Sequence, residues 1–289
     1  MADARAVWLI PYISLQTQYD RLLIKELQQS ADSSRKAVRK LAGRSGIGAV
    51  VRREQLTAAE VALREVLRQM FQSIGATVLA GQQEASITAL ESGFDWDQDL
   101  LKNIYGSDKA KRAQMLKSLL ATAPHNVDAL IMRHRKGGLP LSAQVYNTAA
   151  LADGWLNRTI NSAIGRGANW KELQQDVLQF INPNTPGGAS YAAKRLARTE
   201  INAAYHAVSI ENSKDKPWVK TMTWNLSRSH PHTDICNLLA QSKYAPDDVP
   251  AKPHPQCFCY VTPDLLTQKI FIKNLQAGQY DQYIAAHYT

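Results

Sequence analysis

The sequence predicts a predominantly helical α+β protein, with an extended helical N-terminal region followed by a small α+β domain that contains a short antiparallel sheet. Two observations lead to this fold class. Apolar residues recur at a helical period over most of the chain up to about residue 213. From 218 to 226 the pattern changes to an alternation of β-branched and aromatic residues, which is typical of a strand, and a second such run follows at 257–263.

The composition is that of an ordinary folded protein. The chain has 289 residues, of which 45% are hydrophobic and 20% charged, so it is long enough to form a sizeable core in one or two domains. The early apolar stretch "AVWLIPYI" is too short to span a bilayer, and it lacks the basic flank and cleavage site of a signal peptide. We therefore expect no membrane anchor and no signal peptide.

Two long helices are expected in the N-terminal region. The first covers 15–41, with Pro11 upstream of it. The second begins at Thr57, where Glu60 completes a capping-box pattern, and continues for roughly 35 residues. A helix of this length is consistent with self-association or with docking on another protein, and the alternative is a long core helix.

A basic linker near 35–53 separates these helices. The formal net charge is +9, and no acid lies between Asp32 and Glu54. The basic residues in this interval are Arg35, Lys36, Arg39, Lys40, Arg44, Arg52 and Arg53. Such a cluster attracts polyanions in a salt-dependent way, so we expect non-specific contact with double-stranded DNA. The alternative is a solvated helix face followed by the flexible loop "GRSGIG".

Helical segments continue through the middle of the chain, at 108–123, 142–167, 169–181 and 191–213, and Asn169 is a suitable N-cap. We expect the 257–263 strand to stop at Pro263, and the loop between the two strands to lack regular structure. These patterns predict a helical region at 1–140, an α+β domain at 141–270 and a C-terminal tail at 271–289.

The proline-rich loop between the strands contains the most informative residues. All three cysteines and three of the seven histidines lie between 230 and 259. Four ligands, Cys236, His254, Cys257 and Cys259, suit a tetrahedral structural zinc site, with His230 and His232 as alternates. Two other interpretations stay open: a buried polar and thiol cluster, or a disulfide from Cys236 to Cys257 or Cys259. In each case the loop would be clamped to the sheet.

Three segments, "ARTEINAAYHA", "WNLSRSHPHTDIC" and "PHPQCFC", occur in an order that resembles the Mu F-type head morphogenesis family of tailed double-stranded DNA bacteriophages. The resemblance covers approximately 140–265. Besides the cysteines and His254, it includes Arg198, Thr199, Glu200, Trp224, Ser227, His230 and Asp234. Phe258 departs from the family pattern, which usually has Arg between the two cysteines.

The resemblance implies a structural virion component rather than an enzyme. Members are minor head proteins that associate with the portal protein or the major capsid protein, at the portal vertex or in the capsid interior, and that act in head assembly or DNA delivery. Assembly would take place in the host cytoplasm.

The main alternative is a metal-dependent phosphodiesterase or nuclease. His230, His232, Asp234 and His254 would then ligate a catalytic metal, and Glu200 would act as a general base. Such a site needs an open coordination position, whereas thiolates from the three cysteines would close the shell. The sequence therefore favours a structural role for this cluster over a catalytic one, and we expect no catalytic residue.

Overall fold

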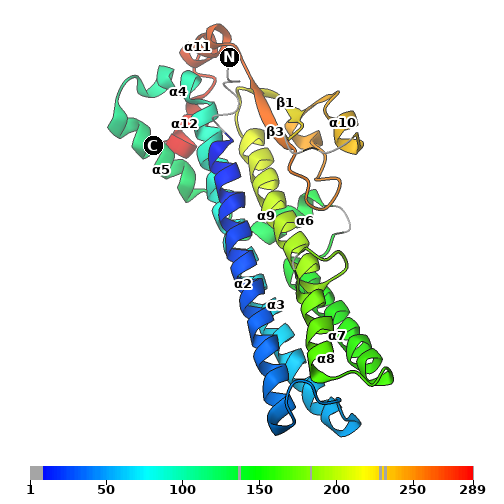
Figure 1. Cartoon of the computed structure of the whole chain (residues 1–289). Helices are drawn as coiled ribbons and strands as arrows, with labels where there is room; N and C mark the ends of the chain where they lie inside the picture. The colour runs from blue at the N-terminus through cyan, green and yellow to red at the C-terminus, as the bar shows by residue number, and fades with distance from the viewer. Residues whose placement is uncertain (1–8, 136–137, 183, 228–229, 231–232, 289) are drawn as a thin grey trace. The chain divides into compact units, whose positions relative to one another are not determined.

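The computed structural model describes residues 9–135, 138–182, 184–227, 230 and 233–288. The chain divides into two compact units (Figure 1). Unit 1 contains residues 1–16, 81–138 and 199–289, and unit 2 contains residues 17–80 and 139–198. The fold is α+β and predominantly helical, as predicted. No helix in the described part of the chain is long and apolar enough to cross a membrane.

The described residues of unit 2 are helical apart from turns and one isolated bridge between Val50 and Asn169. Unit 2 contains most of α2 (Ile10–Ala42), the first part of α3 (Leu56–Trp96), α7 (Leu141–Gly165), α8 (Trp170–Ile181) and the start of α9 (Ala189–Lys214). Two short 3₁₀ turns, Gly43–Ser45 and Arg53–Gln55, connect α2 to α3. A capping box between Asn169 and Glu172 begins α8.

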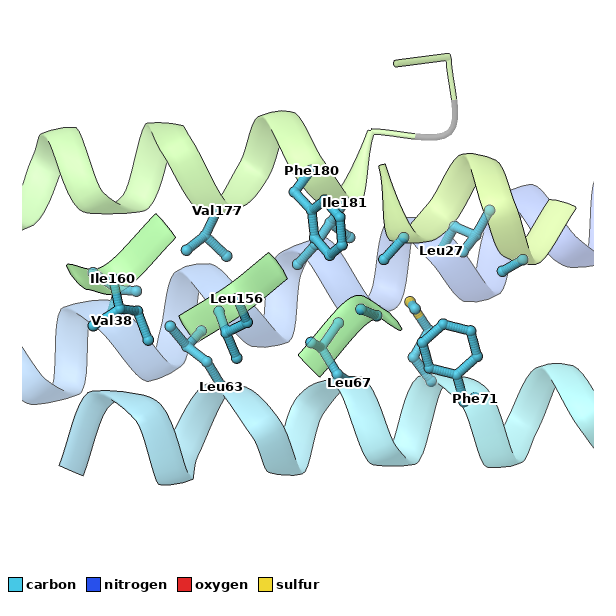
Figure 2. Packing of buried hydrophobic residues seen from close by; sticks show 14 of the residues in the cluster. Leu27, Val38, Leu63, Leu67, Phe71, Leu156, Ile160, Val177, Phe180 and Ile181 are labelled. Atoms are coloured by element: carbon cyan, nitrogen blue, oxygen red, sulfur yellow. The ribbon is translucent and has the colours of Figure 1, made fainter. Parts of the chain in front are cut away.

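One apolar core holds these helices together (Figure 2). Leu27 and Val38 come from α2, Leu63, Leu67 and Phe71 from α3, Leu156 and Ile160 from α7, and Val177, Phe180 and Ile181 from α8. All of these side chains are buried. Because segments far apart in sequence share this core, 17–80 and 139–198 fold as one body.

Unit 1 combines short helices with the sheet. Its helices are α4 (Gln98–Tyr105), α5 (Lys109–Ala121), α6 (Val127–His134), α10 (Ile235–Leu239), α11 (Gln268–Gln276) and α12 (Asp281–Tyr288), together with the adjoining parts of α3 and α9. Helix α12 packs against α5, and α11 packs against α4.

The antiparallel sheet has the strand order β2-β1-β3. The central strand is β1 (Val219–Asn225), flanked by β2 (Lys243–Tyr244) and β3 (Tyr260–Leu265). Met222 and Trp224 point into the core, as the alternation predicts. The prediction that Pro263 stops the second strand is wrong, because Pro263 pairs with Met222 and the strand continues. Since β3 is an edge strand, the missing amide hydrogen is tolerated there.

The predicted boundaries differ from the structure in several places. Pro11 lies inside the first turn of α2, where proline is tolerated. Thr57 lies within α3 and is not its cap, because the helix begins directly after a 3₁₀ turn. The loop between the strands is not structureless: α10, β2 and the 3₁₀ turn Pro246–Asp248 lie in it.

The compact units also differ from the predicted division into 1–140, 141–270 and 271–289. The chain crosses between the units at residues 16, 80, 138 and 198 instead, because each unit collects its core from separate segments. The predicted tail belongs to the core of unit 1. The rings of Phe271, Tyr280 and Tyr283 surround the buried Trp218.

Candidate metal centre

Cys236, a candidate metal ligand, lies in the first turn of α10. The Asp234 carboxylate accepts a hydrogen bond from the Cys236 amide at 2.7 Å, and the Asn237 side-chain oxygen accepts one from the Asp234 amide at 2.9 Å. This reciprocal cap fixes the first turn of a five-residue helix. The Cys236 side chain is fully buried as a result.

Cys257 and Cys259 approach from the other end of the loop. Gln256 precedes them with a φ of 58°, in the left-handed region that residues with a side chain adopt only rarely. The Cys236 and Cys257 Sγ atoms are 3.5 Å apart. All three cysteines are free thiols, and all three are buried.

Two histidines complete the cluster. His254 Nε2 lies 3.4 Å from Cys236 Sγ, and His230 Nδ1 lies 3.8 Å from Cys259 Sγ. The donor atoms of His230, Cys236 and Cys259 lie within 4.8 Å of one another, as do those of Cys236, His254 and Cys257. Cys236 belongs to both groups, so five donor atoms gather at one place. This Cys/His cluster could hold a metal ion.

Each histidine is oriented by a hydrogen bond from its other ring nitrogen. His230 Nε2 lies 2.9 Å from the Asn237 side-chain oxygen, and His254 Nδ1 lies 3.0 Å from the Pro255 carbonyl. At His230 this acceptor favours the tautomer whose Nδ1 lone pair is free on the side of Cys259. Metal-bound histidines are usually held in this way. His254 Nε2 lies near both Cys236 Sγ and, at 3.2 Å, Asp234 Oδ2.

The electrostatic surroundings favour thiolate at one position. The Cys257 thiol lies beside Cys259, and its hydrogen bond holds the pKa of Cys259 well below its usual range. The same hydrogen bond, together with burial, raises the pKa of Cys257.

Lys252 donates a hydrogen bond to the Cys259 carbonyl. Burial lowers the pKa of Lys252, while the neighbouring thiols act in the opposite direction.

Helix α9 fastens the same loop at three points. The Gln256 amide donates to Thr199 Oγ1 at 3.1 Å, and Asn202 Nδ2 donates to the Cys257 carbonyl at 3.3 Å. One turn further along, the ring of His206 donates from Nε2 to the Pro250 carbonyl at 2.9 Å. The loop is therefore held both by the Cys/His cluster and by polar contacts to α9.

The Arg-Thr-Glu triplet places three consecutive side chains on three different partners. Arg198 Nε donates to Asp20 at 2.7 Å within unit 2, whereas Glu200 pairs with Arg135 Nη1 at 2.8 Å within unit 1. Thr199 between them contacts the loop. Successive helical positions point in different directions, so the three side chains cannot share one partner.

The remaining residues of the resemblance also lie beside the cluster. Trp224 is buried in the core that contains the three cysteines, and its ring packs edge-on against His206. A backbone hydrogen bond from Ser227 reaches Cys259 and contributes to its lowered pKa. His232 lies outside the described residues.

Sequence reasoning missed two contributors, Asn237 and Lys252. Asn237 could have been found, since Asp234 followed three residues later by a side-chain hydrogen-bonding residue is a capping pattern. Nothing in the sequence distinguishes Lys252 from the other lysines.

The predicted DNA-contact residues are not part of this centre, because they all lie in unit 2. Arg35, Lys36, Arg39 and Lys40 are exposed on α2, and Arg52 is exposed in the following loop. The side chains of Arg44 and Arg53 lie outside the described part of the structure.

No protein-family model matches the chain, and comparisons with curated proteins and with solved structures returned no match.

Proposed function

We propose that the chain is a structural minor head protein of a tailed double-stranded DNA bacteriophage. It would associate with the portal or the inner capsid and act in head assembly or DNA delivery, in the virion and, during assembly, in the host cytoplasm. The observation that carries the proposal is that the separate elements of the resemblance meet in space. Thr199 of the helix contacts Gln256 of the loop, and Cys236 lies 3.5 Å from Cys257.

We further propose that the Cys/His cluster holds one structural zinc ion. For Zn–S bonds of about 2.3 Å and Zn–N bonds of about 2.0–2.1 Å, tetrahedral geometry separates two sulfurs by about 3.8 Å and a sulfur from a nitrogen by about 3.6 Å. The separation of 3.5 Å between the Cys236 and Cys257 sulfurs and the sulfur–nitrogen separations of 3.4 Å for His254 and 3.8 Å for His230 are close to these values. The ligands would be the three cysteines and one histidine, either His254 or His230.

The net charge of the proposed zinc centre can be balanced by a neighbouring lysine. A zinc ion with three thiolates and one neutral imidazole carries one negative charge, and a buried charge needs a nearby counter-charge. The ammonium group of Lys252 lies beside the cluster through its bond to the Cys259 carbonyl. It would supply the balancing positive charge.

The same features argue against the phosphodiesterase or nuclease alternative. In the proposed zinc centre, four of the five donors would fill a tetrahedral shell and leave no position for a reactive water. Glu200, the candidate general base, is fully buried and paired with Arg135, so it is not accessible to a substrate. We expect no nicking of plasmid DNA when Mg²⁺, Mn²⁺ or Zn²⁺ is added. Nicking that His230→Ala abolishes would overturn the structural assignment.

The proposed role is tested on particles from the virus or prophage that encodes the chain. Mass spectrometry of purified particles should detect the protein at a few copies relative to the major capsid protein. Deletion of the gene should leave heads that are absent, empty or non-infectious. Particles that lack the protein, together with normal heads after the deletion, would contradict the proposal.

A further inference from the structure

The segment between α2 and α3 is folded against α8, and this corrects the expectation of a flexible loop. The Val51 amide donates to the Ala168 carbonyl at 3.0 Å, and the amides of Trp170 and Lys171 donate to the carbonyls of Ala49 and Ile47 at 3.1 and 2.8 Å. Val51 and Trp170 are buried. The end of α2 is tied to the same helix, since Gln174 Nε2 donates to the Arg35 carbonyl at 3.2 Å.

This packing brings the end of α2 and the start of α8, two segments distant in sequence, to one end of unit 2 (Figure 1). Lys36, Arg39 and Lys40 are exposed on the last turns of α2, and Lys171 is exposed on the first turn of α8. These four residues are called the basic surface below. Among the described residues, none of the four has a carboxylate within ion-pair distance, whereas Arg35 and Arg52 pair with Asp32 and Glu54.

Helix stability explains only part of this arrangement. Arg39 and Lys40 lie in the last turn of α2, where cations interact favourably with the helix dipole. Lys171 lies in the first turn of α8, where a cation is unfavourable. Lys36 lies outside the last turn. Charges placed against local preference are typical of functional surfaces.

We propose that the basic surface binds the phosphate backbone of duplex DNA without sequence preference. A duplex presents about one negative charge per 1.7 Å of its axis, so a compact group of unpaired cations releases several condensed counterions on contact. Binding of single strands usually adds aromatic residues on which bases stack. The sequence 30–55 contains no aromatic residue, and the nearby Trp170 is fully buried. These features favour a duplex over single-stranded DNA or RNA.

The test compares the purified full-length protein with two charge-reversal variants. One carries Lys36→Glu, Arg39→Glu and Lys40→Glu. The matched control carries Lys109→Glu, Lys117→Glu and Lys269→Glu, three exposed lysines of unit 1. Both variants change the net charge by the same amount. Binding to a labelled 30-base-pair duplex of arbitrary sequence is measured by fluorescence anisotropy between about 50 and 200 mM salt.

We expect the basic-surface variant to bind the duplex at least about tenfold more weakly than the wild type. The plot of log K against log salt should also become less steep, its slope smaller in magnitude by about 2.7, because each of the three lost phosphate contacts contributes about 0.9. The control should stay within about twofold of the wild type, with an unchanged slope. Equal losses in both variants would show a general charge effect and would overturn the proposal. Tighter binding to a single-stranded DNA or RNA 30-mer than to the duplex would also overturn it.

Exposed substitutions should leave the fold intact, and circular dichroism checks this. If the reversal variant unfolds, the neutral set Lys36→Gln, Arg39→Gln and Lys40→Gln replaces it, with a smaller expected loss in the same direction. The biological meaning of the contact rests on the proposed head-protein role. The binding itself is measured on the isolated protein, so DNA binding and particle association can fail separately.

Discussion

At the scale of single residues, Glu200 is a buried charge whose partner, Arg135, is partly exposed. Its side chain has no exposed surface, and Arg135 approaches it at 2.8 Å. Removing one partner of a buried ion pair typically costs about 3–5 kcal/mol. Arg135 is itself about a quarter exposed, at 24%, so we place its contribution at or below the lower end of that range.

Arg135→Met should therefore lower the free energy of unfolding by about 2–3 kcal/mol, measured by urea denaturation. Arg133→Met, at an exposed position two residues earlier in the last turn of α6, is the matched control and should change it by less than about 0.5 kcal/mol. The double variant Arg135→Met and Glu200→Gln should recover part of the loss. Similar effects at positions 133 and 135 would contradict the importance of this pair.

The buried His206 makes the free energy of unfolding depend on pH. Burial, with a smaller contribution from the Lys252 charge, lowers the pKa of His206 to about 3. The unfolded state, with a pKa near 6.5, therefore binds a proton that the folded state rejects between these two values. The stabilisation from neutral His206 is complete above about pH 6.5 and decreases as the pH falls towards 3.

The measurement compares the wild type with His206→Gln at equal metal content. The stability difference between the two proteins should shrink by about 2 kcal/mol between pH 7.5 and pH 5. Because the metal ligands are also protonated in acid, only this difference isolates His206. A difference that does not vary with pH would show that His206 titrates normally in the folded protein.

The sequence identified the cysteines and histidines of the cluster because few residue types bind zinc and these were concentrated in one window. It could not assign Thr199 to the loop. The choice among Arg198, Thr199 and Glu200 depends on the rotation of α9 about its own axis, and that rotation is set by packing against segments distant in sequence.

At the scale of elements, the long helices were predictable from periodicity, and their ends were less so. Asn169 carries a local capping signal and was placed correctly, while α11 and α12 were interpreted as a tail. These two helices are short, and their stability comes from tertiary contacts rather than from a long periodic pattern. Phe271 and Tyr280 contact the ring of Trp218, a partner more than fifty residues earlier that periodicity cannot reveal.

Two neighbouring residues of α11 test whether this segment belongs to the core. Phe271 is fully buried, whereas Ile270 is 45% exposed. Phe271→Ala should lower the free energy of unfolding by about 3–5 kcal/mol, and Ile270→Ala by less than about 1 kcal/mol. Denaturation followed by tryptophan fluorescence measures both. Equal small effects would mean that 271–289 is the loosely attached tail predicted from sequence.

At the scale of the whole molecule, each compact unit is assembled from separate stretches of chain. Unit 2 joins 17–80 to 139–198, and unit 1 takes three stretches. A prediction made along the sequence assigns neighbouring residues to one domain, so it could not produce these boundaries. The fold class was nevertheless predictable, since helical and strand periodicities are local properties.

The central claim is that distant cysteine and histidine side chains form one metal centre that fastens the loop of unit 1. Metal ligation and folding are coupled in such sites, so loss of the ion should loosen the loop. Cys236 is the most informative ligand, because it belongs to both groups of donors. His125, which is exposed and outside the cluster, provides a matched control.

The most direct measurement is the metal content of the full-length protein purified without added metal. Inductively coupled plasma mass spectrometry gives this content for the wild type and for the variants Cys236→Ser and His125→Gln. The account predicts about one zinc per chain in the wild type and in His125→Gln, and a large loss in Cys236→Ser. A wild-type protein without bound metal, whose thermal stability is also unaffected by added zinc or by a chelator, would contradict it.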